Sequence, residues 1–356
     1  MSTGEFGLAL LGVAVGSIIS LPTAGWLIAH YGSKPVTLVS SIWFCLVLAG
    51  PAFAASGREL WLALFVLGLA AGAMDVSMNA QGVAVERWAK RPMMSGFHAM
   101  FSIGGMAGAA VGGLIAKAGV SVRAHFCFAA ILFLATILAA SRGLLPGSAD
   151  SAPGRRVFHL SPEILGLGIL TLCFFLSEGA MADWTAIYLR EFLRAGPAQA
   201  ASGYACFSAT MALGRMVGDP LRSRFGAATL VRSGSVLAAV GIALALVSPS
   251  VTGALAGFAM VGFGSSVIVP IAFVAAGNAG GGGGLSLVAT MGYFGLFIGP
   301  PVIGFAAEAV TLRRSLALLI GLLLSGLVFA RLGKAAETKR DALFEEAENA
   351  EHPKPV

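Results

Sequence analysis

The sequence predicts an all-α integral membrane protein made of two helical bundles. Hydrophobic residues make up 57% of its 356 positions, charged residues make up only 11%, and the mean hydropathy is +0.86. A soluble domain carries about twice that share of charge. The apolar residues fall into eleven segments, each long enough to cross a hydrocarbon layer of ~30 Å. We therefore expect 11 transmembrane helices, five in the first bundle and six in the second.

The apolar segments follow one another with short polar interruptions. We expect them at residues 6–29, 36–56, 60–85, 94–116, 122–141, 163–189, 200–218, 229–249, 252–276, 285–309 and 315–331. Pro51 and Pro270 fall inside two of them, where neighbouring groups can satisfy the backbone that proline frees. After residue 331 the chain becomes charged, so we expect a solvated tail that is partly helical.

The longest loop between segments marks the boundary between the two bundles. Residues 142–163 are rich in Pro, Gly, Ser and Arg, and they separate five segments from six. The expected organisation is an N-terminal bundle over 1–141, a cytoplasmic inter-bundle loop over 142–162, a C-terminal bundle over 163–331 and a charged cytoplasmic tail over 332–356.

Weak internal similarity predicts that the two bundles are parallel repeats. At an offset of 192 to 194 residues, FSIGGMAGAAVGGLIA (101–116) pairs with YFGLFIGPPVIGFAAE (293–308), and Gly32 pairs with Gly226. Two parallel repeats are typical of transporters whose halves rock against each other. The alternative is that glycine-rich membrane helices resemble one another by chance.

The distribution of basic residues predicts the orientation in the membrane. If the loop after the first segment is cytoplasmic, fifteen Lys and Arg residues fall in cytoplasmic segments and seven fall in external loops. Cytoplasmic loops carry the excess of basic residues in membrane proteins. We therefore expect a multi-pass protein of the plasma (inner) membrane with a cytoplasmic C-terminus, and with Met1 outside.

A carboxylate inside an apolar segment is the first candidate site. Asp75 lies well within segment 60–85, where an acid costs ~2.5 kcal/mol or more unless it faces a cavity or a partner. Asn79 lies one turn later on the same helix face, and small residues surround the pair. The pair predicts a polar site in the membrane. The alternative is a protonated Asp75 that only bonds a neighbouring helix.

Three further ionisable residues in apolar segments are candidates for the same pathway. Glu178 and Asp183 lie in segment 163–189 and are about 140° apart around the helix, so they cannot both centre on one face. Glu178 either lines a cavity or forms a buried structural hydrogen bond, and the cavity is the favoured interpretation. Asp183 either lines the pathway or anchors the helix at the membrane surface. His98 either shares a proton with Asp75 or packs at the inner end of its segment.

Two loops carry the pattern of a known family. The segment GWLIAHYGSK (25–34) resembles the loop signature of the major facilitator superfamily, G-x-x-x-D-R-x-G-R-K: Gly25, Gly32 and Lys34 match, and three positions of the signature depart from it. The segment GRMVGDPLRSRFG (214–226) is a second copy, and its matching or nearby residues are Gly214, Arg215, Gly218, Asp219, Arg224 and Gly226. The resemblance implies two bundles with gate loops at their cytoplasmic ends. We interpret Arg215 and Asp219 as a gate or loop ion pair rather than as residues that bind the solute.

The segment DVSMN (75–79) narrows the resemblance to one branch. It resembles the acid-x-x-x-Asn of the fourth helix in fucose and glucose/galactose permeases. That resemblance implies a proton-linked acid at Asp75 and a solute contact at Asn79. It also makes the first segment equivalent to the family's second helix, so that the family's first helix is expected to be missing and Met1 to be an internal or misassigned start, or the gene to be truncated.

The same sequence argues against an enzyme. It has no Ser-His-Asp spacing, metal cluster or nucleotide-binding loop, and the run Gly280–Gly284 lacks the Lys-Ser/Thr of a phosphate loop. We expect no cofactor, no metal and no nucleic acid. The predicted function is secondary active transport of a small polar, sugar-like solute with a proton, by a monomer in the lipid bilayer. The alternative is a membrane protein of the same fold that binds or senses a ligand without transport, or an inactive truncated transporter.

Overall fold

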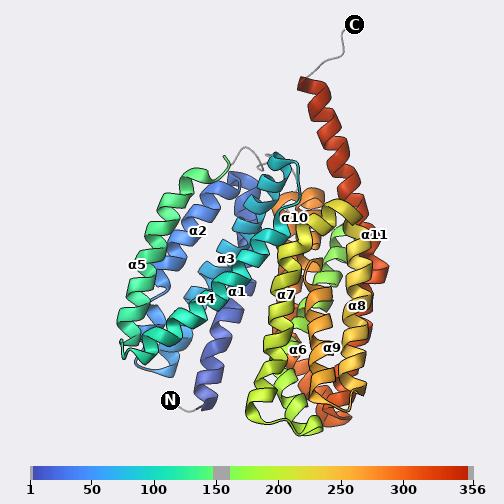
Figure 1. Ribbon diagram of the computed structural model, residues 1–356. Helices are drawn as coiled ribbons and strands as arrows, with labels where there is room; N and C mark the ends of the chain where they lie inside the picture. The colour runs from blue at the N-terminus through green and yellow to red at the C-terminus, as the bar shows by residue number, and fades with distance from the viewer. Residues whose placement is uncertain (1–2, 147–160, 352–356) are drawn as a thin grey trace. The chain divides into compact units, whose positions relative to one another are not determined.

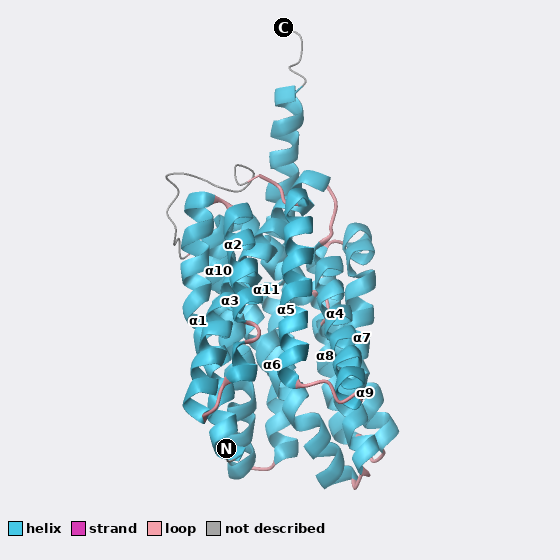
Figure 2. Ribbon diagram, turned by 90° about the vertical axis from the view of Figure 1, so that its left-hand side faces the viewer, coloured by secondary structure: helices cyan, strands magenta, loops and turns pink. Residues whose placement is uncertain are grey.

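The computed structural model describes residues 3–146 and 161–351, and every regular element in them is a helix (Figures 1 and 2). Most of the predicted inter-bundle loop, 147–160, lies outside the described residues, as does the end of the tail. The α-helices are α1 (Thr3–Tyr31), α2 (Ser33–Val47), α3 (Gly57–Ala89), α4 (Met94–Lys117), α5 (Val122–Ala140), α6 (Pro162–Leu193), α7 (Pro197–Phe225), α8 (Ala227–Val247), α9 (Val251–Ser265), α10 (Ile268–Ala309) and α11 (Leu312–Glu351). Two short 3-10 helices are η1 (Gly50–Phe53) and η2 (Ser141–Gly143).

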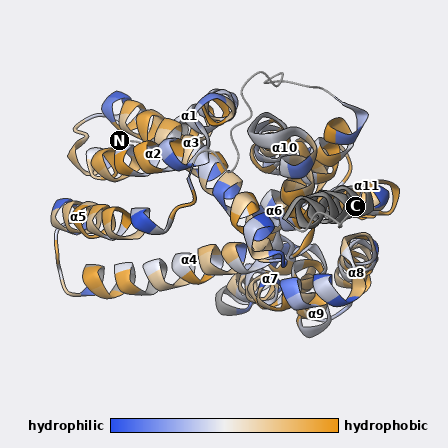
Figure 3. Cartoon of the chain, turned by 90° about the horizontal axis from the view of Figure 1, so that it is seen from above, coloured by the Kyte–Doolittle hydropathy of each residue, from blue (hydrophilic) through white to orange (hydrophobic). Residues whose placement is uncertain are grey.

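Eight stretches of the described chain are long and apolar enough to cross a membrane. One of them, Val251–Ala309, covers two of the predicted segments. The helices α4 and α7 are not among the eight, although both coincide with predicted segments and are 24 and 29 residues long. In each part of the chain most helix faces are hydrophobic (Figure 3). The predicted all-α membrane fold is confirmed, while the count of eleven spans stays a prediction.

Proline shapes two of the predicted segments more than expected. Helix α2 ends at Val47, and Pro51 is the second residue of the separate 3-10 helix η1 instead of continuing α2. Segment 252–276 is also interrupted, because α9 ends at Ser265 and α10 begins at Ile268. Pro270 has no N–H to donate to the carbonyl of Ser266 four residues earlier, which explains why the helix breaks there.

The predicted glycine turn at residues 280–284 is a sharp kink within α10. Only Gly281 leaves helical geometry, with φ 59° and ψ −150°, a conformation that residues with a Cβ rarely adopt. The helix continues on both sides of it. The turn between the two predicted segments is therefore reduced to one residue.

The described chain forms two compact units. The first unit, which we call the N-terminal unit, contains residues 1–85, 101–159 and 280–290. The second, the C-terminal unit, contains residues 86–100, 160–279 and 291–356. Each half of the chain thus contributes one short stretch to the other unit: residues 86–100 at the end of α3 and the start of α4, and residues 280–290 around the kink of α10. The bundle boundaries expected from the sequence stay a prediction.

Close packing of small residues holds the helices of each unit together. In the N-terminal unit a Cβ added at Gly16 of α1 would meet the backbone of α3 at Phe65, and Ser17 Oγ donates to Gly68 O at 3.1 Å. In the C-terminal unit Gly241 of α8 and Gly257 of α9 approach in the same way. The abundance of glycine therefore serves close helix contact, as is usual in membranes.

Candidate functional site

Asp75 and Asn79 are in contact on α3 in the N-terminal unit. Asn79 Nδ2 donates to the backbone oxygen of Asp75 at 2.8 Å and to its Oδ1 at 3.3 Å. The Asn79 side chain is buried and that of Asp75 is half-buried. The shared helix face expected from their spacing is therefore present, and the carboxylate has an amide partner within its own helix.

The neighbouring helices approach α3 around this pair through small polar residues. Ser40 of α2 and Ser77 of α3 form a hydrogen bond of 3.3 Å between their hydroxyls. On another side, a Cβ at Gly72 would meet Ser17 and Ser20 of α1. These contacts position α3 between α1 and α2, and so fix the face that carries Asp75.

Glu178 and Asp183 lie on α6 in the C-terminal unit and differ in exposure. Asp183 is exposed, whereas Glu178 is half-buried. Trp184 Nε1 donates to Pro300 O of α10 at 3.1 Å, so this end of α6 is tied to α10. The different surroundings agree with the expectation that the two acids do not share one face.

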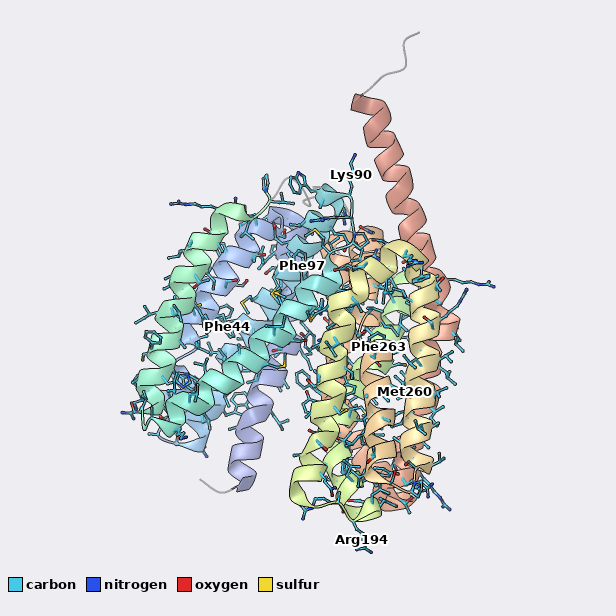
Figure 4. The ribbon with its side chains drawn as sticks, viewed as in Figure 1. Phe44, Lys90, Phe97, Arg194, Met260 and Phe263 are labelled. Atoms are coloured by element: carbon cyan, nitrogen blue, oxygen red, sulfur yellow. The ribbon has the colours of Figure 1, made fainter. Side chains whose placement is uncertain are left out.

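His98 lies on the first turns of α4, in the part that belongs to the C-terminal unit. Its ring meets Phe273 of α10 edge-on at 5.9 Å, and the charge of Arg215 also acts on it. Its neighbour Phe97 is labelled in Figure 4. Because Asp75 belongs to the other unit, a proton shared between Asp75 and His98 stays a prediction.

Residues Gly25–Lys34, which we call the first loop, form the end of α1, Gly32 and the start of α2. They contact the part of α10 after its kink. A Cβ on Gly25 would meet the side chain of Ser286, and Ser286 Oγ donates to Leu21 O at 2.6 Å. Gly32 has φ 77° and starts α2. These contacts are formed by small or apolar groups.

Lys34 of the first loop takes part in a second set of contacts in the N-terminal unit. Its Nζ donates to Leu144 O at 3.1 Å. The neighbouring Leu145 exchanges two hydrogen bonds with Gln81 of α3, whose Nε2 also donates to Ser33 Oγ at 2.8 Å. Lys34 and Gln81 therefore hold the chain where it leaves α5 toward the inter-bundle loop.

Residues Gly214–Gly226, which we call the second loop, form the last turns of α7 and the glycine that follows it. They place Asp219 against the start of α4 in the C-terminal unit. Asp219 Oδ1 accepts from the backbone N–H of Ser95 at 3.0 Å, and Oδ2 accepts from that of Gly96 at 2.7 Å. The first N–H groups of a helix have no partner within the helix and attract negative charge. Asp219 is thus a cap for α4 supplied by another helix.

Glu86, near the end of α3, completes this cap. Its Oε2 accepts from the backbone N–H of Met93 at 2.9 Å and of Met94 at 3.0 Å, and its Oε1 accepts from Arg222 Nη1 at 2.7 Å. Both side chains of this ion pair are nearly inaccessible to solvent, at 4% for Arg222 and 2% for Glu86. We call Glu86 and Asp219 together the acid cap of α4.

Arg87, the next residue of α3, binds the C-terminal end of the first part of α10. Its Nε donates to Asn278 Oδ1 and its Nη2 to Gly277 O, both at 2.8 Å, just before the kink of α10. Lys90 then turns the chain with φ 53° and lies at the end of the C-terminal unit opposite to Arg194 (Figure 4). The adjacent residues Glu86 and Arg87 of α3 therefore bind the start of α4 and the end of the first part of α10, respectively.

The sequence missed Glu86, Arg87 and Asn278 as functional candidates. From the sequence, Glu86 and Arg87 mark the end of an apolar segment and Asn278 belongs to a turn. Their partners are far away in the sequence, so the contacts could not be predicted. The four N–H groups at the start of any helix need acceptors, and this requirement is the one signal that points to the acids nearby. Of the two arginines at the end of α7, Arg222 is buried, whereas Arg224 is exposed and lies 5.3 Å from the Phe225 ring.

Gly226, the last predicted gate residue, has φ 78° and starts α8 as Gly32 starts α2. Arg215, one turn before Asp219, is buried at 8% exposure. Among the described residues no cluster of His, Cys, Asp and Glu has the arrangement of a metal site.

Comparison with known proteins identifies the same family that the two loops resemble. Residues 1–281 match the family model of the Major Facilitator Superfamily. An uncharacterised MFS-type transporter of Yersinia pestis is 35% identical over 334 residues, which is 93% of this chain and 87% of that protein.

Solved structures share the fold at low sequence identity. The fucose:proton symporter of E. coli superposes with a TM-score of 0.76 at 16% identity, over 93% of this chain and 91% of that one. The human organic anion transporter MFSD10 superposes with a TM-score of 0.74, also at 16% identity, over 91% and 83%. With the helical units and paired loops described above, these matches show that the chain is a multi-pass integral membrane protein and a secondary transporter that belongs to the major facilitator superfamily.

Proposed function

We propose that this transporter moves a small polar, sugar-like solute together with a proton, and that Asp75 carries the proton. The observation behind this proposal is the contact of Asp75 with Asn79 inside an apolar helix. In a bilayer a neutral acid is tolerated and an unpartnered charged one is costly, so protonation and burial of Asp75 are linked. The likeness of fold to a protein named as a fucose:proton symporter supports this assignment.

In the proposed site Asn79 couples the binding of the solute to the protonation of Asp75. An amide both donates and accepts, and its Nδ2 already donates to the Asp75 carboxylate. A solute hydroxyl that takes over this amide removes a donor from the ionised acid and favours its protonated form. Solute and proton then enter together. Glu178, Asp183 and His98 are proposed as further pathway residues.

The two loops are proposed as cytoplasmic gates of alternating access. We assign the cytoplasmic side to the first and second loops and to the C-terminus, in the plasma membrane, because the basic residues gather on that side. The proposed bundles are residues 1–141 and 163–331. The acid cap of α4 and the contact of α10 with Gly25 are the interactions that break and re-form as the gate opens.

The test is proton-driven uptake by Asp75→Asn in reconstituted vesicles. We expect the variant to insert, and to exchange solute down its gradient, but to lose accumulation driven by a pH gradient, because the amide cannot release a proton. The matched control is Glu308→Gln on the exposed face of α10, which should accumulate solute like the parent. Unchanged proton-driven uptake by Asp75→Asn would show that the acid only supports the structure.

The same assay distinguishes transport from ligand sensing. A sensor of this fold binds solute without net flux, so it gives no accumulation in the parent protein at any pH gradient. The parent is expected to accumulate at least one solute of a sugar panel. Binding without flux across the entire panel would favour the sensor.

A further inference from the structure

A groove of about 590 Å³ runs along α8 in the C-terminal unit. The residues that line it are Thr229, Arg232, Ser233, Val236, Leu237 and Val240. They follow one another at intervals that place them on a single face of the helix, and most of them are exposed. Ligand pockets occupy roughly 300–1,000 Å³, so the groove has room for a bound molecule.

The chemistry of the groove changes along the helix. Its polar residues lie in the first two turns of α8, and its apolar residues follow. At about 1.5 Å per residue, Thr229 and Val240 are ~16 Å apart along the axis, which is about half of a hydrocarbon layer of ~30 Å. The groove therefore has the length of one lipid leaflet, with a polar end and an apolar end.

The polar end offers donors that the described part of the chain does not use. Arg232 lies in the candidate span Ala227–Val247, is exposed, and forms no hydrogen bond or ion pair with the described residues. An arginine in a membrane span is costly unless it pairs with an anion or reaches the polar surface. The side chain of Thr229 makes no hydrogen bond to a described residue either, whereas Ser233 Oγ donates to Thr229 O at 2.9 Å.

We propose that this groove binds one anionic phospholipid, with the phosphate on Arg232 and an acyl chain along Val236 and Val240. A guanidinium donates two parallel hydrogen bonds to a phosphate, and basic pockets beside membrane helices bind anionic headgroups. The hydroxyl of Thr229 supplies a further donor. The apolar half of the groove selects a lipid over a soluble phosphate, because only a lipid fills both ends. None of these residues belongs to the proposed solute pathway, so the inference goes beyond the proposed function.

The first test compares two lipids that differ only in the headgroup. The purified full chain in neutral detergent is mixed with equal amounts of phosphatidylglycerol and phosphatidylcholine that carry the same acyl chains, and native mass spectrometry counts the lipids retained. We expect the first lipid bound to be phosphatidylglycerol with a preference of about 10-fold, which corresponds to ~1.4 kcal/mol. Lipids bound after the first should show a smaller preference, because the groove is then filled. Equal retention of the two lipids overturns the proposal.

Variants then assign the preference to the polar end of the groove. Arg232→Gln should abolish the preference, and Thr229→Val should reduce it by about 3-fold, as expected for the loss of one hydrogen bond. Both positions are exposed, so both variants should fold. The matched control is Arg314→Gln, which removes the same charge from an exposed position in the first turn of α11 and should bind like the parent. A preference retained by Arg232→Gln, or lost equally in Arg314→Gln, overturns the site, since the preference would then follow the overall charge.

Two further variants and a competitor separate a lipid from a soluble anion. Val240→Trp fills the apolar end and should weaken retention of phosphatidylglycerol, whereas Val247→Trp, at an exposed position outside the groove, should leave it unchanged. Glycerophosphoglycerol, the same headgroup without acyl chains, should not displace the lipid even in large excess. Displacement by glycerophosphoglycerol, or unchanged retention in Val240→Trp, would assign the groove to a soluble anion and overturn the lipid. An equal loss in Val247→Trp would also overturn it.

Discussion

The first and second loops have the same backbone geometry and opposite chemistry. Gly32 and Gly226 begin the helices that follow, with φ 77° and 78° and ψ 165° and 154°. At the offset of 194 residues that pairs these glycines, Asp219 of the second loop corresponds to Gly25 of the first. Asp219 caps the start of α4, and Gly25 packs against Ser286 of α10. This position thus contacts another helix in both loops, through a charged side chain in the second loop and through close packing in the first.

A second pair of positions repeats this contrast. Arg222 corresponds to Ile28 at the same offset. Arg222 forms the buried ion pair with Glu86, whereas Ile28 is fully buried against Gly282 of α10. In both loops the residue at this position contacts another helix. The contact is an ion pair in the second loop and apolar packing in the first. We therefore expect mutation and added salt to change the stability of the charged contact of the second loop more than that of the uncharged contact of the first loop.

The largest effect is expected for Glu86→Ala in the second loop's contact. The substitution leaves Arg222 buried without its carboxylate and frees the N–H groups of Met93 and Met94, at a cost of about 3–5 kcal/mol in the free energy of unfolding. Thermal unfolding in detergent measures it. The double variant Glu86→Ala/Arg222→Ala should recover much of the loss. A loss below 1 kcal/mol in the single variant would mean that the pair is solvated.

The next largest effect on transport is expected when a bulky residue replaces Gly32 or Gly226, the two glycines of positive φ. Gly32→Leu and Gly226→Leu each force a left-handed conformation on a branched side chain, which costs about 1–3 kcal/mol. Both variants should insert in the membrane but transport more slowly, to a similar degree, because the two glycines have the same φ. Normal uptake by Gly32→Leu would exclude a gating role for the first loop.

A smaller effect is expected for Asp219→Asn. The amide keeps one acceptor oxygen for the start of α4 but loses the charge that favours a helix N-terminus, so about 0.5–2 kcal/mol of stability should be lost. The stability of the parent should fall with added salt more than that of the variant, because screening acts on charge. An equal salt dependence of parent and variant would show that the cap is insensitive to charge.

The smallest effect is expected for Ser286→Ala in the first loop's contact. It removes the hydrogen bond to Leu21 O, worth about 0.5–1.5 kcal/mol, and leaves the close packing at Gly25 intact. Its unfolding should show no change in salt dependence relative to the parent. A salt-dependent loss as large as that of Asp219→Asn would contradict the uncharged character of this contact.

The sequence alone predicted the helical membrane fold, the position of most helices and the pairing of the two loops. These features depend on local information: apolar length, the spacing of Asp75 and Asn79, and glycine where φ is positive. The effect of proline on the helices was predicted less well, since the helix breaks just before Pro270 in a segment that the sequence predicts to be continuous. Whether a proline ends a membrane helix depends on its neighbours, which the sequence does not show.

Only the tertiary structure revealed the acid cap. Glu86 and Arg222 are 136 residues apart, and Asp219 lies more than 120 residues from the N–H groups that it caps. The sequence shows each as an ordinary charge at the end of a segment. The structure brings them together because unpaired N–H groups at the start of α4 and a buried guanidinium both need carboxylates, and only folded helices decide which carboxylates are within reach.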